Sequence, residues 1–197
     1  MTAEKFLKIL ERASKLKVNT RHNWTEADRK ESVADHSWRV ALMAMLLDGI
    51  EEFESVDIDR VIRMCIIHDL GEAFTGDVPS FEKTGSDEKL EEEAFDGWVA
   101  KFPEPQRSEW HSLLAEMKEL QTQEAKLYKC LDKMEALISH DEADISTWLP
   151  IEYELQLTYG VEEAQFSEYT KLLKETIDDI TRQKIADAEA AGMAKKD

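Results

Sequence analysis

Apolar residues recur at helical spacing along most of this chain, and few glycines or prolines interrupt them. The 197 residues include seven Gly and four Pro, which favours long helices with few breaks. The expected helices cover residues 3–17, 32–47, 57–72, 86–99, 110–117, 122–139, 151–161 and 164–186. No repeat or linker divides the chain, so we expect one all-α domain, a single helical bundle over residues 1–197.

Four segments need separate interpretation. Residues 18–31 break the helical period and are predicted to form a long loop, and residues 73–86 form a second loop that contains Gly, Pro and Ser. Residues 151–161 alternate with a period of two, as strands do. A strand without a partner leaves its backbone unpaired, so we expect a helix there. The tail, residues 187–197, is expected to fray.

Charge and cysteine content exclude several classes of protein. A net charge of −18 repels nucleic-acid backbones and anionic lipid, so we expect no binding to polynucleotides. The two cysteines, Cys65 and Cys130, lie in apolar helical patterns and are expected to be core residues of a protein in a reducing compartment. The longest apolar run, Val40–Leu47, is too short to span a membrane. The first residues form a charged amphipathic helix rather than a signal peptide, so we predict a cytoplasmic protein with no membrane partner.

One polar pair stands directly behind an apolar run. His68 and Asp69 follow Met64–Ile67, and two further carboxylates, Glu72 and Asp77, come within nine residues of His68. Buried polar groups are costly unless they are hydrogen-bonded or bound to a metal. The pair is therefore either a satisfied core pair or the edge of a site.

Two other helices carry side chains that can bind a metal. His36 lies on an apolar helix face, and Asp132 flanks the apolar seam of a later helix. A single histidine on such a face is more often a satisfied core residue than a ligand. Together with His68 and Asp69, however, these residues would supply two imidazoles and two carboxylates. That mixed set suits one Mn²⁺, Fe²⁺, Co²⁺ or Mg²⁺ ion with open positions for water, whereas structural zinc prefers cysteines.

The histidine–aspartate dipeptide by itself is a weak signal, because the chain contains a second one. His140 and Asp141 open the polar run H-D-E-A-D, which is expected to be a solvated helix end. His22 and His111 receive no role from the sequence.

The order of His36, His68-Asp69 and Asp132 resembles the HD-domain phosphohydrolase superfamily. Two strings are more specific: H-D-x-x-E-x-x-T-G-D-x-P, which runs from His68 to Pro79, and E-S-V-A-D-H-S around His36. They resemble the YfbR-like branch of metal-dependent 5′-nucleotidases acting on deoxyribonucleoside monophosphates. The likeness covers about residues 21–138, followed by C-terminal helices over 142–186. It implies an all-helical homodimer with one divalent metal held by the same four side chains.

The resemblance also implies that Glu72 and Asp77 work beside the metal as catalytic residues. On a continuous helix Glu72 lies one turn beyond His68, where it can orient or deprotonate the attacking water. Asp77 can protonate the leaving ribose oxygen or position the nucleophile. As an alternative, both are solvated loop acids.

Substrate contacts are expected from the segment before the first histidine helix. The branch has an Arg followed by a Trp there, whereas this chain reads Arg21-His22-Asn23-Trp24, with two residues between them. Arg21 can pair bidentately with a phosphate, Trp24 can pack against a sugar, and Lys83 is a further counter-charge. Arg21 and Lys83 can otherwise be ordinary surface cations.

The sequence thus predicts a metal-dependent phosphohydrolase that removes the 5′-phosphate of (deoxy)ribonucleoside monophosphates through a metal-activated water. The alternatives keep the same site: a phosphodiesterase, a nucleoside triphosphate hydrolase, or a non-catalytic module that binds nucleotides. The G-Y-P signature of cyclic-dinucleotide enzymes does not occur in the chain. A pure binding module would not need Glu72 and Asp77 in addition to the four ligands.

Overall fold

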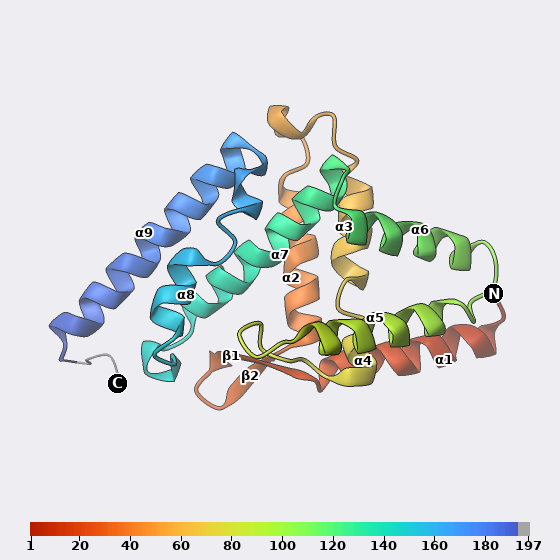
Figure 1. Cartoon of the computed structure of the whole chain (residues 1–197), viewed down its shortest axis with the longest axis horizontal. Helices are drawn as coiled ribbons and strands as arrows, with labels where there is room; N and C mark the ends of the chain where they lie inside the picture. Colours follow the sequence, from red (N-terminus) through yellow and green to blue (C-terminus); the bar gives the residue numbers. More distant parts are fainter. Residues whose placement is uncertain (193–197) are drawn as a thin grey trace.

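Helices dominate the fold, as the apolar periodicity predicts. The computed structural model describes residues 1–192 (Figure 1). The elements are α1 (Ala3–Ala13), η1 (Ser14–Lys17), β1 (Thr20–Glu26), β2 (Arg29–Ser32), α2 (Val33–Leu46), η2 (Glu51–Phe53), α3 (Ile58–Ile67), α4 (Glu72–Thr75), α5 (Gly85–Val99), α6 (Gln106–Glu119), α7 (Gln123–Glu142), η3 (Ile145–Thr147), α8 (Glu152–Thr158), η4 (Glu163–Phe166) and α9 (Glu168–Ala190). The η elements are short 3₁₀ helices.

The helix α7 lies in the middle of the molecule. It packs against α2 and α3 on one side and against η4 and α9 on the other (Figure 1). The larger hydrophobic cluster contains Val40, Met64 and Leu131 from α2, α3 and α7. A smaller cluster joins Leu137 of α7 to Ile177 of α9. Both faces of α7 are therefore occupied, and its polar side chains near α2 and α3 lie inside the protein.

The capping residues determine where α2 begins. The Ser32 hydroxyl accepts a hydrogen bond from the Asp35 N–H, and the Asp35 carboxylate accepts one from the Ser32 N–H. From this start, the helical period places Val33, His36 and Val40 on the buried face. The predicted start of this helix is confirmed, and the cap positions His36 towards α3 and α7.

The prediction of a loop over residues 18–31 is wrong. Strands β1 and β2 form an antiparallel hairpin in which Thr20 pairs with Ser32 and Trp24 with Lys30, with irregular register between the paired positions. The strand β1 has the sequence T-R-H-N-W-T-E and is nowhere fully buried, so it lacks the alternating apolar pattern by which strands are recognised. Its central polar side chains instead line a cavity.

The predicted helix over residues 57–72 ends earlier than expected. Helix α3 stops at Ile67, and the Leu70 and Ala73 N–H groups bond to carbonyls three residues back, which makes tighter turns than an α-helix. Glu72 therefore begins a separate short helix, α4. Gly76 follows α4 with φ of +80°, a conformation that favours glycine and explains this residue in the T-G-D string.

The C-terminal region contains the predicted helices. Residues 151–161 contain α8, so the choice of helix over strand there is confirmed. Helix α9 continues to Ala190, beyond the predicted end at residue 186, and Ala188 is buried against Trp148 and Ile145. Residues 187–190 are thus helical in the structure, the fraying of the tail stays a prediction, and residues 193–197 lie outside the described part of the chain. No helix within residues 1–192 has the length and hydropathy needed to cross a bilayer.

Candidate active site

Four side chains from three parts of the chain converge on one point. His36 comes from α2, His68 and Asp69 follow α3, and Asp132 lies on α7. His36 Nε2 is 3.2 Å from His68 Nε2 and 3.2 Å from Asp132 Oδ1. Asp69 Oδ2 is 3.1 Å from His68 Nε2 and 3.7 Å from His36 Nε2. The structure thus brings together all four predicted metal ligands.

The hydrogen bonds of the two imidazoles test whether these residues fit a metal. His68 Nδ1 is 2.7 Å from the Cys65 carbonyl oxygen, which can only accept, so Nδ1 carries a proton. His36 Nδ1 contacts the fully buried carboxylate of Glu135 in the same way. In the neutral rings both Nε2 atoms therefore present lone pairs to each other and to two carboxylates. Ligands about 2.1 Å from a metal in neighbouring positions lie about 3 Å apart, so the four atoms fit a divalent ion.

A group of acids surrounds this cluster. Glu72 is 3% exposed, and its Oε2 has no hydrogen-bond partner among the described residues. Burial, together with the charges of Asp69 and Asp77, raises the pKa of Glu72 to about 10 in the metal-free protein. Burial also raises the pKa of Asp77. Glu91 of α5 packs directly against Gly71. Only glycine leaves room for this contact, because a Cβ atom at residue 71 would lie 2.6 Å from Glu91 Cγ.

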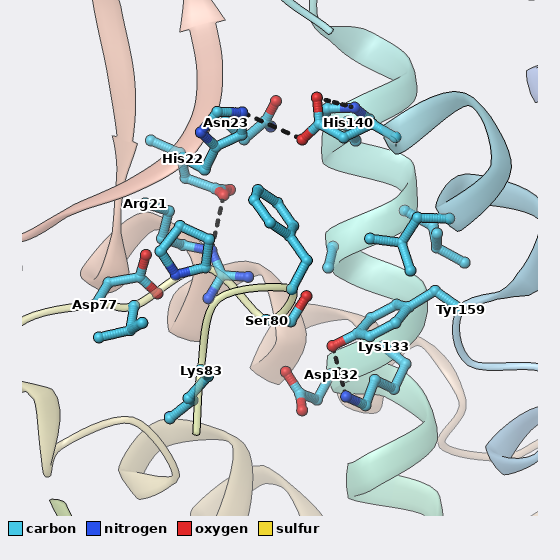
Figure 2. Close-up of a pocket in the computed structure, with 18 of the residues that line it drawn as sticks. Arg21, His22, Asn23, Asp77, Ser80, Lys83, Asp132, Lys133, His140 and Tyr159 are labelled. Carbon is cyan, nitrogen blue, oxygen red and sulfur yellow. Dashed lines mark hydrogen bonds and ion pairs between the residues drawn. The ribbon is translucent and has the colours of Figure 1, made fainter. Parts of the chain in front are cut away.

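Cationic side chains line a cavity that Asp69 and Asp132 of this cluster also line. The cavity has a volume of about 360 Å³, within the range of roughly 300–1,000 Å³ for small-molecule sites. Arg21 and Lys83, both predicted as substrate contacts, line it together with Lys129 and Lys133. Figure 2 shows Arg21, Lys83 and Lys133 around this cavity. Arg21 Nη1 is 3.5 Å from Asp69 Oδ2, and Lys129 Nζ is 2.8 Å from Asp132 Oδ2. A cavity lined by metal-ligating side chains, further carboxylates and cationic side chains can hold an anionic substrate beside a metal.

The family model described as HD domain matches residues 13–174. The chain belongs to the HD-domain family. It is 32% identical to the human 5′-deoxynucleotidase HDDC2 over 144 residues, which are 71% of this chain and 69% of the relative.

Two solved structures resemble this HD-domain protein as a whole. A predicted metal-dependent phosphohydrolase from Magnetospirillum magnetotacticum MS-1 is 26% identical, with a TM-score of 0.68 over 88% of this chain and 91% of that chain. A conserved hypothetical protein from Pyrococcus furiosus is 30% identical, with a TM-score of 0.61 over 87% and 99% of the two chains. The predicted family and all-α class are confirmed.

The HD-domain protein does not bring Trp24 to the cavity. Arg21, His22 and Asn23 of β1 line it, whereas Trp24, the next residue of the same strand, does not. Trp24 instead lines a second hollow with Trp38, and its ring lies 5.4 Å from Lys30 Nζ. The predicted contact between Trp24 and a sugar therefore has no support in the geometry.

His140 is not the solvated helix end that its polar neighbours indicate. It is 8% exposed and lines the cavity, and its ring stacks on Trp148 with ring centroids 4.4 Å apart. Burial, helped by the charges of His22 and Lys184, lowers the pKa of His140 to about 4, so the ring is neutral at pH 7. The polar run H-D-E-A-D carries no sign of this burial, because Trp148 stacks on His140 only in the folded chain.

Nothing in the sequence indicated that Glu135 belongs to the site. Its contact with His36 leads to a prediction. Glu135→Gln should weaken metal binding by about 10–100-fold, because the carboxylate holds the His36 ring in its ligating orientation. The measurement is a metal titration at equilibrium. Glu142→Gln on the same helix is the control, since Glu142 is exposed and pairs only with Arg39 among the described residues. Equal affinities for the two variants would contradict this role.

The raised pKa values of Glu72 and His68 predict how the stability of the metal-free protein changes with pH. Glu72 keeps its proton when folded but releases it near pH 4.3 when unfolded, so its contribution to stability decreases as pH rises above that value. His68, whose pKa the neighbouring carboxylates raise to about 10 against the effect of burial, acts in the same direction between about pH 6.5 and 10. When a chelator keeps the protein free of metal, its melting temperature should therefore fall as the pH is raised from 6 to 9. Added metal should reduce this slope, as should Glu72→Gln, and a rising melting temperature would contradict the assignment.

Proposed function

We propose that this protein is a metal-dependent 5′-deoxynucleotidase, a phosphoric monoester hydrolase that removes the 5′-phosphate of (deoxy)ribonucleoside monophosphates. The observation that carries the proposal is the convergence of His36, His68, Asp69 and Asp132 at a cavity lined by both acids and cations. The activity named for the human relative supports the same substrate class.

Each part of the site has a role in this reaction. When bound by the four ligands, a divalent ion activates water at neutral pH and polarises phosphoryl oxygens. Arg21 offers a planar pair of donors to the phosphate, and Lys83 and Lys129 add positive charge along the same cavity. Glu72 and Asp77 hold or move protons, one at the attacking water and the other at the leaving ribose oxygen. The unpartnered Oε2 of Glu72 is available for this.

Arg21→Lys tests the phosphate contact. This variant keeps the charge but loses the bidentate geometry, so KM should rise about ten-fold while kcat changes less. Arg63→Lys on the exposed side of α3 is the control, because Arg63 does not line the cavity. Steady-state kinetics with a deoxynucleoside monophosphate measure both constants. An unchanged KM would remove Arg21 from the substrate site.

The proposed function is tested by a screen of the metal-loaded protein. Deoxyribo- and ribonucleoside mono-, di- and triphosphates and a phosphodiester are incubated with Mn²⁺, Co²⁺, Fe²⁺ or Mg²⁺, and released phosphate and nucleoside are measured. We expect phosphate from the monophosphates. Hydrolysis of only triphosphates or diesters would replace the proposal with the corresponding alternative, and no hydrolysis of any ester would favour a binding module.

The proposal includes a homodimer in the cytoplasm. Helix α1 has no buried residue and exposes Phe6, Leu7 and Leu10, an apolar face that a second copy would cover. The two free, buried cysteines agree with a reducing compartment. Light scattering of the purified protein measures the oligomeric state, and a monomeric mass would contradict the dimer.

A further inference from the structure

The cavity extends beyond the ligand cluster to a second group of polar side chains. Glu152 of α8 is 5% exposed, and its Oε1 lies 3.2 Å from His22 Nε2 of β1. Its Oε2 accepts the Leu149 N–H at 2.5 Å and lies 3.6 Å from His140 Nε2. Glu152 lines the same cavity as Asp132. Figure 2 shows its partners His22 and His140 at one end of this cavity and Asp132 at the other.

This end of the cavity contains polar atoms that are buried without a hydrogen bond. They are His22 Nε2, Asn23 Oδ1 and His140 Nε2, since neither imidazole approaches Glu152 with hydrogen-bond geometry. Asn23 is held in place by Ser139, whose hydroxyl accepts from Asn23 Nδ2 at 2.8 Å while it donates to Glu31. Buried polar atoms without partners are costly, so a ligand that supplies hydrogen bonds here would complete the site.

Helix α7 forms a continuous wall between the two ends. Asp132, Ala136 and His140 are four residues apart and all line the cavity. At about 1.5 Å per residue, Asp132 and His140 are separated by about 12 Å along the helix axis, which is comparable with the length of an extended nucleotide. The small side chain of Ala136 lies between them.

The same end also offers apolar surface. Leu137, Leu155 and Phe81 line the cavity there, and the Phe81 ring meets the His22 ring edge-on with centroids 5.7 Å apart. A flat aromatic ligand can contact these side chains while its edge reaches Glu152.

We propose that this end of the cavity is a nucleobase subsite in which Glu152 recognises an N–H donor on the edge of the base. The inference rests on the proposed function, because a phosphate beside the four ligands directs the rest of a nucleotide along α7. The carboxylate accepts the base N–H, Asn23 Oδ1 is a second acceptor, and the neutral His140 ring contributes a donor or an acceptor. Glu152 and His140 are thus specificity-determining residues.

Binding of nucleosides tests the subsite independently of hydrolysis. The metal-loaded protein is titrated in a calorimeter with the four 2′-deoxynucleosides and with purine 2′-deoxyriboside, whose base has the purine shape but no N–H. At least one natural deoxynucleoside should bind about ten-fold more tightly than purine deoxyriboside, as expected for a hydrogen bond to a charged group. Glu152→Gln, which removes the charge at constant shape, should reduce this ratio to near one.

The control variant is Glu154→Gln, on the same helix but exposed, which should leave the ratio unchanged. A ratio near one in the wild type overturns the subsite. If Glu152→Gln weakens the binding of every nucleoside equally, the subsite is also overturned. That result would indicate that Glu152 only holds β1, α7 and α8 together.

Turnover separates this inference from the proposed function. For the wild type, kcat/KM should be higher for deoxynucleoside monophosphates than for 2-deoxyribose 5-phosphate, and Glu152→Gln should lower only the nucleotide value. Selective nucleoside binding without any phosphate release would retain the subsite and reject the nucleotidase. Equal hydrolysis of nucleotide and abasic ester would retain the phosphatase and reject the subsite.

Discussion

Asp69→Ala is expected to abolish both metal binding and hydrolysis. Asp69 Oδ2 lies within 3.1 Å of His68 Nε2 and 3.7 Å of His36 Nε2, so this one substitution removes a carboxylate from the centre of the cluster. Metal content should fall from about one ion per chain to almost none. The loss of metal affinity should exceed the roughly 100-fold upper range expected for Glu135→Gln, which acts only through His36.

Metal analysis after gel filtration, together with phosphate release, measures both effects. Asp59→Ala is the matched control, because Asp59 lies exposed in the first turn of α3 and far along that helix from His68. A chain without metal that still hydrolysed its substrate would reject the proposed role of the cluster.

Glu72→Ala should have the second largest effect, and it should act on rate rather than on metal content. Loss of a positioned acid or base costs about 10²–10⁴-fold in rate. Glu72 lies beside the ligand cluster without being one of the four converging side chains, so the metal should remain. Because its buried carboxyl has an unpartnered Oε2 and a raised pKa, its removal should not destabilise the metal-free protein. Asp77→Ala is expected to behave similarly in rate.

The control for both variants is Glu82→Ala, an exposed acid in the same loop as Asp77. Turnover of a deoxynucleoside monophosphate, metal content and melting temperature are measured for all three. Wild-type turnover in both Glu72→Ala and Asp77→Ala would reject the mechanism. Loss of metal in Glu72→Ala would instead make Glu72 a ligand.

Local sequence determined the helices and the candidate ligands. Apolar spacing encodes one buried face per helix, and this signal predicted α2, α7 and α9 without knowledge of their neighbours. His36 and His68 stand at apolar positions of such faces, so the burial of their side chains followed from the same pattern. The strings around His36 and from His68 to Pro79 then predicted the family.

Tertiary structure alone decided which polar groups meet. Glu135 contacts His36 across 99 residues of sequence, and Glu152 meets His22 although one lies on α8 and the other on β1. The hairpin was missed for a related reason, because β1 directs polar side chains such as Arg21 into a cavity instead of apolar ones into a core. Periodicity reports which side of an element avoids water. A hydrogen bond or ion pair between distant segments depends on the positions of both partners, and only the packing of α7 against the surrounding elements sets those positions.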